Sequence, residues 1–326
     1  MYKNDSSIYI SIVIPTFNEE ESVIQVVSDL HKTMEQTEYS YEVVVVDDYS
    51  TDDTIEKIKH RSDIRLIKHK SNQGSGAARR TGIREARGEI IVMIDADGTY
   101  PAKEIPQLLK YFPEYDQVNG ARKNESGDLR FFRSIAKWFI KSLACFLTKE
   151  EIPDLNTGLK AFKRDIALKY LWALPNGFSC VSTLTLSFLC NGYSVKYIPI
   201  DYYPRNNSKS KFHPIKDTYS YLITVIRMIS YFQPMKVFLP VSLLLFTVGI
   251  LKTLYDYQLI QRMQLSDIVI FTASFVIFCL GVLADLIVAQ AKRIGGINEK
   301  ILKDLVNEIK QEENEKRNKE QVFSNK

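Results

Sequence analysis

The fold of this chain is decided by the stretch EIIVMIDADGTYP, residues 89–101. Its apolar and mostly β-branched run, residues 90–94, predicts a buried strand, and the carboxylates of Asp95 and Asp97 follow at the carboxyl end of that strand. Open α/β sheets bind their ligands at that end. Two oxygen ligands at positions i and i+2 suit a hard divalent cation, Mg²⁺ or Mn²⁺, which usually bridges the phosphates of a substrate. The alternative is a turn in which Asp97 and Gly98 only close the strand.

The residues before this stretch repeat a strand and helix pattern. Short apolar runs at residues 8–14, 41–46 and 64–67 predict three further strands, and apolar residues at helical spacing lie between them, as in the segment 23–30. This βαβαβαβ succession predicts a mainly parallel, Rossmann-like sheet with helices on both faces.

Polar residues follow three of the four predicted strands. The first strand is followed by Asn18 and Glu19, the second ends in Asp47 and Asp48, and the fourth leads into residues 95–97. Because the carboxyl ends of parallel strands share one edge of the sheet, the three turns predict a common ligand site. The alternative is helix capping, since Asn18 and Thr51 both precede helical patterns.

A glycine-rich turn, NQGSGAARRTG at residues 72–82, lies between the third and fourth strands. Such a turn at the start of a helix is expected to present free backbone N–H groups near Gly76, with Arg79 and Arg80 one turn further on, and that favours a diphosphate. The glycine spacing does not match the dinucleotide fingerprint, and the turn follows the third strand instead of the first. A nicotinamide enzyme is therefore a poor fit.

The composition of the 326 residues is ordinary for a globular protein, with 45% hydrophobic and 25% charged residues. A net charge of +4 gives no global electrostatic case for nucleic acid as a partner. The four cysteines show neither paired nor metal-type spacing, which predicts reduced thiols in a cytosol-facing protein. The polar amino terminus carries no basic-then-apolar signal, so we expect residues 1 to about 235 not to be exported.

Two apolar stretches in the last third, residues 237–254 and 268–288, are near the length that spans a bilayer. Lys252 and Asp285 lie towards the ends of these stretches, where Lys252 could reach the interface and Asp285 could sit there or face a partner helix. The flanking lysines and arginines predict a transmembrane hairpin (237–290) of a cell membrane or ER-type membrane, with both termini in the cytoplasm. The alternative is a buried hairpin of a soluble protein.

Three further segments are predicted to be helical or surface-bound. Residues 129–148 form an amphipathic pattern with a basic face, which fits either a helix at a membrane surface or one packed on the sheet. Residues 213–236 are apolar with tyrosines and predict a membrane-surface segment. The charged tail, 291–326, predicts a solvated helix that could support a homo-oligomer.

Three segments carry a family resemblance: SIVIPTFNEE (11–20), VVDDYSTDDT (45–54) and DAD (95–97). They look like the nucleotide-sugar-binding motifs of the inverting family 2 glycosyltransferases, which implies a GT-A fold for the predicted catalytic domain, residues 1–212. The resemblance implies that Asp95 and Asp97 bind the metal and the diphosphate. The resemblance implies that Pro15, Thr16, Glu19 and Asp48 contact the base and ribose of the donor. The predicted nucleotide site also includes Asn18, Asp47, Gly76, Arg79 and Ala96, from the polar turns, the glycine-rich turn and the DAD segment.

Two later segments, DLNTGLKAF (154–162) and RNNSKSK (205–211), resemble motifs of the dolichyl-phosphate mannose synthase branch and its bacterial polyprenyl-phosphate relatives. Arg205, Ser210 and Lys211 combine a planar fork, a hydroxyl and a point charge, which suits a phosphate group. The resemblance places Arg122 and Arg133 near the same site as further cations. The alternative is a solvated basic loop.

The stretch 176–184, where many relatives supply a catalytic base, contains no acid. A phosphate monoester acceptor is already anionic at neutral pH and needs no base, so the absence agrees with a lipid phosphate.

Together these features predict inverting transfer of one sugar from a nucleotide sugar, GDP-mannose or UDP-hexose, to dolichyl or undecaprenyl phosphate, with Asp95, Asp97 and Arg205 as catalytic residues. One rival is a processive polysaccharide synthase, which two spans and the lack of a Gln-x-x-Arg-Trp element disfavour. The other is a non-catalytic membrane module that binds nucleotide sugar or lipid phosphate. Thr99 keeps it open, because some relatives have an amide side chain at that position near the metal.

Overall fold

The computed structural model describes residues 8–123, 145, 150–177, 179–203, 231 and 234–290. The chain divides into two compact units, Met1–Ile229 and Ser230–Lys326. The predicted segments 129–144, 146–148, 213–230 and 291–326 lie outside the described residues.

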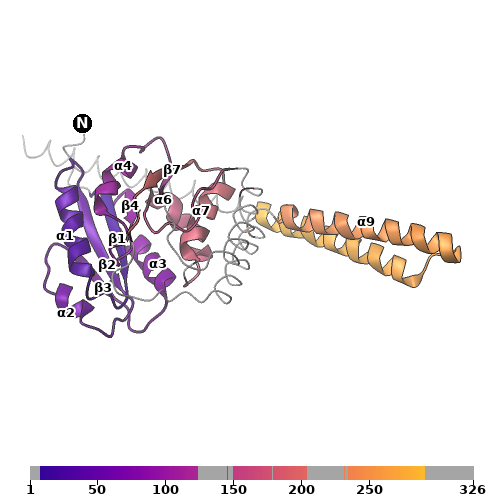
Figure 1. Ribbon diagram of the computed structural model, residues 1–326, viewed down its shortest axis with the longest axis horizontal. Coiled ribbons are helices and arrows are strands. Elements are labelled where there is room, and N and C mark those ends of the chain that lie inside the picture. Colours follow the sequence, from indigo (N-terminus) through magenta and orange to yellow (C-terminus); the bar gives the residue numbers. More distant parts are fainter. Residues whose placement is uncertain are drawn as a thin grey trace, which may run out of the picture. The chain divides into compact units, whose positions relative to one another are not determined.

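The first unit is built on one sheet, whose described strands follow the order β3-β2-β1-β4-β6-β5-β7 (Figure 1). Every neighbouring pair is parallel except at β6, which runs antiparallel to both β4 and β5. The predicted mainly parallel sheet is therefore confirmed, and the four predicted strands correspond to β1–β4. The strands are β1 (Ile10–Thr16), β2 (Tyr41–Asp47), β3 (Arg65–Lys68), β4 (Ile90–Met93), β5 (Gln117–Arg122), β6 (Lys160–Lys163) and β7 (Val195–Ile200).

Helices cover both faces of the sheet, as the alternating pattern predicts. Side chains of one strand point alternately to the two faces, so Ile12 and Ile14 of β1 join one core while Val13 joins the other. The first core is completed by α1 (Val23–Met34), α2 (Thr54–Ile58), η1 (Ala102–Glu104) and α4 (Ile105–Leu109). The second is completed by α3 (Ser75–Glu85), α6 (Arg164–Lys169), η2 (Leu171–Ala173) and α7 (Cys180–Cys190).

The strand register brings the predicted motifs to one edge. Thr16 at the end of β1 lies opposite Asp47 at the end of β2, and β4 ends beside them with Met93. Because β6 runs the other way, its first residue, Lys160, lies opposite Met93. The residues that precede β6 therefore return to the edge at which β4 ends.

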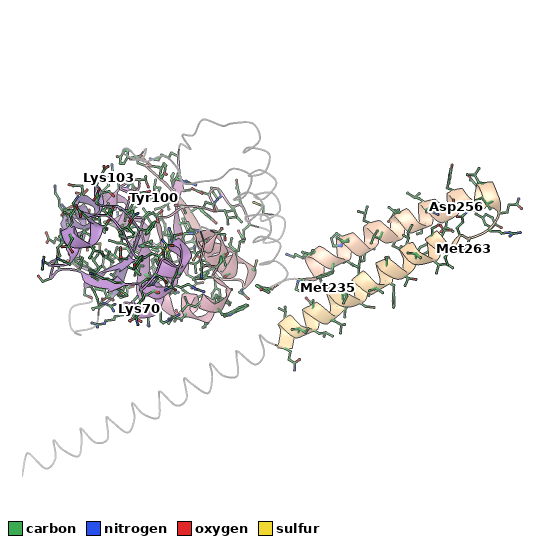
Figure 2. The ribbon with its side chains drawn as sticks, turned by 90° about the horizontal axis from the view of Figure 1, so that it is seen from below. Lys70, Tyr100, Lys103, Met235, Asp256 and Met263 are labelled. Carbon is green, nitrogen blue, oxygen red and sulfur yellow. The ribbon has the colours of Figure 1, made fainter. Side chains whose placement is uncertain are left out.

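The second unit contains two long apolar helices, α9 (Met235–Ile260) and a helix at Leu265–Gln290. Both are long and apolar enough to cross a membrane, with mean hydropathies of 2.1 and 2.4. They run side by side in both views, with Met235 at one end of the pair and Asp256 and Met263 near the other (Figures 1 and 2). The predicted spans, 237–254 and 268–288, lie within these helices.

Small and aromatic residues hold the two helices together. The hydroxyl of Ser274 donates a hydrogen bond of 2.8 Å to the carbonyl of Ser242, and the rings of Phe246 and Phe271 lie 5.5 Å apart. Close backbone approach and interhelical hydrogen bonds of this kind favour helix association in lipid.

Candidate active site

Asp95 follows β4 and is clamped from two sides. Nη2 of Arg79, a buried residue of α3, lies 2.5 Å from Asp95 Oδ1. On the other side, a Cβ added to Gly158 would collide with Asp95 Oδ2. The backbone N–H of Gly158 donates to the hydroxyl of Tyr100 at 2.7 Å, which fixes this turn against the site. The carboxylate is thus held in one orientation by α3 and by the turn before β6.

Asp97 is oriented by its own turn. Its Oδ1 accepts hydrogen bonds from the backbone N–H of Thr99 at 3.1 Å and from the Thr99 hydroxyl at 2.7 Å. Thr99 is buried, and Gly98 between them adopts a φ of +72°, which favours glycine. Thr99, the residue that departs from the amide of some relatives, therefore serves to orient Asp97.

The two carboxylates fit a hard cation held with few protein ligands. Within the described ranges, no group of three or more His, Cys, Asp and Glu side chains could hold a metal ion. Mg²⁺ and Mn²⁺ accept such a set, because they are commonly bound by one or two carboxylates together with waters and substrate phosphates. Nε and Nη1 of Arg79 are also buried without a hydrogen-bond partner in the described structure, which adds unsatisfied donors next to Asp95.

The turns after β1 and β2 are fastened to each other. Asn18 Oδ1 accepts a hydrogen bond from the backbone N–H of Thr51 at 2.8 Å, and the N–H of Asn18 donates to Ser50 Oγ at 2.9 Å. Because α1 begins at Val23 and α2 at Thr54, neither Asn18 nor Thr51 caps a helix. The capping alternative is wrong, and the two side chains instead stiffen the edge.

The other residues predicted for the nucleotide lie at the same edge. Pro15 and Thr16 are the last residues of β1, and Asp47 Oδ2 accepts from the N–H of Ser50 at 3.1 Å. The N–H of Glu19 donates to Thr54 Oγ1 at 2.9 Å, and the Ala96 carbonyl accepts from Ser22 Oγ at 2.7 Å. The structure thus brings these residues together, while their contacts with a nucleotide stay predictions.

Asp48 supports the glycine-rich turn. Its buried carboxylate lies 2.7 Å from His69 Nδ1 and accepts from the N–H groups of Gln73 at 2.9 Å and Gly74 at 2.7 Å. Both oxygens of Asp48 are therefore engaged within the protein. A contact between this residue and the base or ribose remains a prediction.

The expectation of free N–H groups at the glycine-rich turn is wrong. The carbonyl of Asn176 accepts hydrogen bonds from the N–H of Gly76 at 2.6 Å and of Ala77 at 3.3 Å. Arg80 binds the same segment, with Nη1 donating to the carbonyl of Leu174 at 3.1 Å. The loop before α7 thus occupies these donors, and the turn contributes through the Arg79 side chain. The nucleotide roles of Gly76 and Arg79 stay predictions, without free amides at Gly76.

Arg122, predicted to bind the acceptor phosphate, is paired inside the protein. Its Nε and Nη2 lie 2.7 and 3.0 Å from the two oxygens of Asp154, and its guanidinium stacks on Tyr202 with a centroid distance of 5.3 Å. Burial alone would raise the pKa of Asp154, but the hydrogen bonds and charge of Arg122 outweigh it and hold that pKa below its usual range. The positive charge of Arg122 is therefore neutralised by Asp154. The role of Arg122 in phosphate binding stays a prediction.

The other predicted acceptor residues lie outside the described structure: Arg133, Arg205, Ser210 and Lys211. The described chain reaches Tyr203, whose backbone N–H donates to the carbonyl of Thr99 at 2.9 Å. The chain that leads into the basic loop is thus attached to the turn that carries Asp97.

Three residues at the site were not singled out by sequence reasoning: Asp154, Gly158 and Lys160. All three belong to the stretch 154–162, whose resemblance to relatives was the only available signal. Lys160 is fully buried, and its Nζ donates to the Val181 carbonyl at 2.9 Å and to Thr185 Oγ1 at 2.8 Å. A lysine at the start of a short strand is a weak sequence signal, because lysines at strand ends are usually solvated.

Residues 11–171 match the family described as Glycosyl transferase family 2, and residues 233–289 match the GtrB C-terminal hairpin. The chain belongs to glycosyl transferase family 2. The family resemblance read from the three motifs is therefore confirmed, as is an apolar hairpin after the family 2 region.

Curated relatives of this family 2 chain include three lipid-phosphate enzymes. The chain is 32% identical over 163 residues to undecaprenyl-phosphate 4-deoxy-4-formamido-L-arabinose transferase of Proteus mirabilis, covering 48% of this chain and 49% of the relative. It is 33% identical over 167 residues to dodecaprenyl-phosphate galacturonate synthase of Rhizobium johnstonii, with 49% of each chain covered. A dolichyl-phosphate hexose transferase of Haloferax volcanii is 28% identical over 207 residues, 60% of this chain and 83% of the relative. The chain spans about half the length of the first two relatives.

Solved structures of other proteins share the family 2 fold. Glucosyl-3-phosphoglycerate synthase from Mycobacterium tuberculosis, in complex with Mn²⁺, UDP-glucose and phosphoglyceric acid, superposes with a TM-score of 0.54 at 17% identity. The match covers 68% of this chain and 79% of that chain. The similarity supports a GT-A fold for the first unit.

Proposed function

We propose that this family 2 glycosyltransferase transfers one sugar, with inversion, from a nucleotide sugar to a polyprenyl phosphate. The observation that carries the proposal is the pair Asp95 and Asp97 at the sheet edge, the first fixed by Arg79 and Gly158 and the second by Thr99. The names of the three relatives, all of which use a lipid phosphate, support the acceptor class.

In the proposed donor site, Asp95 and Asp97 hold Mg²⁺ or Mn²⁺ together with the donor diphosphate. When bound, the metal would neutralise the charge that develops on the departing nucleoside diphosphate. The hydrogen-bonded turns at Asn18 and Thr51 would form a rigid surface against which the base and ribose bind. The donor is GDP-mannose or a UDP-hexose; the Mn²⁺ and UDP-glucose in the Mycobacterium tuberculosis neighbour support the metal and make the uridine donor a natural first test.

For the acceptor, we propose that the basic loop Arg205, Ser210 and Lys211 binds the lipid phosphate. Tyr203, which precedes this segment in the chain, donates its N–H to the Thr99 carbonyl, in the turn that carries Asp97. The stretch 176–184 supplies no acid, and part of it braces the glycine-rich turn through Asn176. A phosphate oxygen can attack the anomeric carbon without a general base, because it is already ionised. The hairpin would keep the first unit at the membrane that holds the lipid, with the catalytic unit and both termini in the cytoplasm.

The test is sugar transfer by the full chain in detergent, from labelled GDP-mannose and labelled UDP-hexoses to undecaprenyl and dolichyl phosphate. Asp97→Asn should reduce Mn²⁺- or Mg²⁺-dependent transfer by at least about 100-fold, because the site loses one of two carboxylate ligands. Asp165→Asn, which changes an exposed carboxylate of α6, is the matched control and should be fully active.

Full metal-dependent activity of Asp97→Asn would overturn the site assignment. A product that grows by repeated addition would indicate a processive synthase, and nucleotide binding without transfer to any lipid would indicate a non-catalytic module.

A further inference from the structure

Lys160 is a fully buried lysine below the edge that carries Asp95 and Asp97. It begins β6 opposite Met93 of β4, and its Nζ donates to two oxygens of α7, the Val181 carbonyl and Thr185 Oγ1. Both acceptors are neutral. The Lys160 ammonium therefore joins β6 to the first turns of α7 without an ion pair.

The charged and titratable groups that face Lys160 come from four elements. Asp154 precedes β6, Asp95 follows β4, Arg79 lies on α3 and Cys180 begins α7. The Asp154 carboxylate is already paired with Arg122, and the Asp95 carboxylate with Arg79.

The fifth neighbouring element, β5, contributes amides. Gln117 Nε2 donates to Thr185 Oγ1 at 3.0 Å and to Asn119 Oδ1 at 2.8 Å, so both amides belong to the same buried network. Among the described residues, Lys160 therefore has no carboxylate of its own.

A buried ammonium without a counter-charge is costly, since desolvation favours the neutral amine. Burial lowers the pKa of Lys160 to about 7, although Asp154 acts in the opposite direction. Near neutral pH the side chain is then divided between its two protonation states, and a nearby anion favours the charged one.

We propose that Lys160 is a positioning residue that takes up a proton when a nucleoside diphosphate binds at Asp95 and Asp97. The inference rests on the proposed function, because it requires a diphosphate at that edge. A nucleoside diphosphate with one divalent cation keeps a net negative charge at neutral pH. The positive charge of protonated Lys160 stabilises that anion. Its two hydrogen bonds also hold α7, and the loop before α7 contacts the glycine-rich turn through Asn176.

The proton uptake can be measured by calorimetry on the full chain in detergent. UDP and GDP are titrated separately with saturating Mn²⁺ near pH 7.5, in two buffers of different ionisation enthalpy, and the difference in heat gives the protons bound. At that pH the wild-type lysine is only about one quarter charged, so up to about 0.7 proton per site can be taken up. We expect uptake in the wild type to exceed that in Lys160→Arg by at least about 0.3 proton, because arginine stays charged throughout.

The matched control is Lys163→Arg, in the same strand, where the lysine lies 2.8 Å from Asp116 and is partly exposed. This variant should keep the wild-type uptake. The affinity of the wild type for the nucleotide should also weaken as pH rises from 7 to 9, by up to about tenfold per unit, and Lys160→Arg should flatten that dependence.

Nucleotide binding with the same proton uptake in the wild type and in Lys160→Arg would overturn this inference alone. If neither nucleotide binds the wild type, the proposed function and this inference both fail. Should Lys160→Arg fail to fold, the wild type decides, because an affinity that is constant between pH 6.5 and 9 would exclude the coupling.

Discussion

Asp95 depends on a neighbour that has no side chain. Gly158→Ala would place a Cβ against Asp95 Oδ2 and the ring of Tyr100, so the carboxylate must leave the position set by Arg79. Because a small misplacement of a ligand at the reacting centre costs about 100-fold in rate, we expect transfer to fall by about 10- to 100-fold. Activity assays at several Mn²⁺ concentrations measure both the rate and the metal requirement.

Gly177→Ala is the control for this prediction, since a Cβ at Gly177 meets no atom within 4 Å. That variant should keep wild-type transfer. Overpacking at Gly158 is expected to lower the free energy of unfolding by about 1–3 kcal/mol, which leaves most domains folded. Wild-type activity in Gly158→Ala would show that the Asp95 orientation seen here is not required.

At the scale of single elements, the glycine-rich turn shows where sequence reasoning stops. The turn and the start of α3 could be predicted from residues 72–82 alone, because glycine and helix patterns are local signals. The partner of its N–H groups, Asn176, lies about a hundred residues later in the chain. Only the packing of α7 and its preceding loop brings the two together, and no local pattern reports that contact.

The hairpin gives a second example, at Lys252. The prediction that this lysine reaches the interface omitted its partners: Nζ lies 2.6 Å from Asp256 on the same helix and 2.8 Å from Asp267 on the other. Asp285, in contrast, is exposed in the described helix pair. The i,i+4 relation to Asp256 was readable from the sequence, whereas the bond to Asp267 requires the two helices to pair.

Lys252→Met should therefore destabilise the hairpin, because it leaves Asp256 and the fully buried Asp267 without their cation. We expect a lower thermal midpoint of the detergent-solubilised chain, partly restored by the double variant Lys252→Met with Asp267→Asn. Arg262→Met removes an exposed cation from the connection between the helices and serves as the control. An unchanged midpoint in Lys252→Met would mean that the three charges are solvated instead of coupled.

Across the whole first unit, the sheet and the edge that carries Asp95 and Asp97 follow from the sequence more fully than the predicted acceptor residues do. β1–β4 carry repeating local patterns, so their parallel pairing and the meeting of Asn18, Asp47 and Asp95 at one edge could be predicted. The reversed direction of β6 could not, since a strand of four residues, KAFK, carries no directional signal. Asp154 and Lys160 were missed for the same reason, because their roles depend on how β6 pairs.

The stability of the whole unit should depend on pH through Lys160. In the unfolded chain its pKa returns to the ordinary value near 10.5, whereas burial lowers it to about 7 in the folded state. Between these values the unfolded chain binds more protons, so the free energy of unfolding rises with pH. Urea unfolding of the wild type and Lys160→Met at pH 7 and 9 measures this contribution.

We expect the wild type to gain stability relative to Lys160→Met as pH rises from 7 to 9. The comparison cancels other titrating groups as long as both chains unfold in one transition. A constant difference between the two chains would show that Lys160 does not titrate in this range.

The antiparallel course of β6 also sets the order in which the site is completed during synthesis. Strands β1–β5 and the carboxylates of Asp95 and Asp97 leave the ribosome before Gly158 does, because they precede it in the chain. Domains tend to fold from the amino terminus as they are made. A nascent chain can therefore hold Asp95 and Asp97 at the edge before the turn at Gly158, which lies against Asp95, has been synthesised. The Gly158 turn takes its place beside Asp95 only after β6 has been translated and has paired with β4. Translation arrested before residue 158 should therefore yield a chain that folds part of the sheet and holds Asp95 through Arg79 alone.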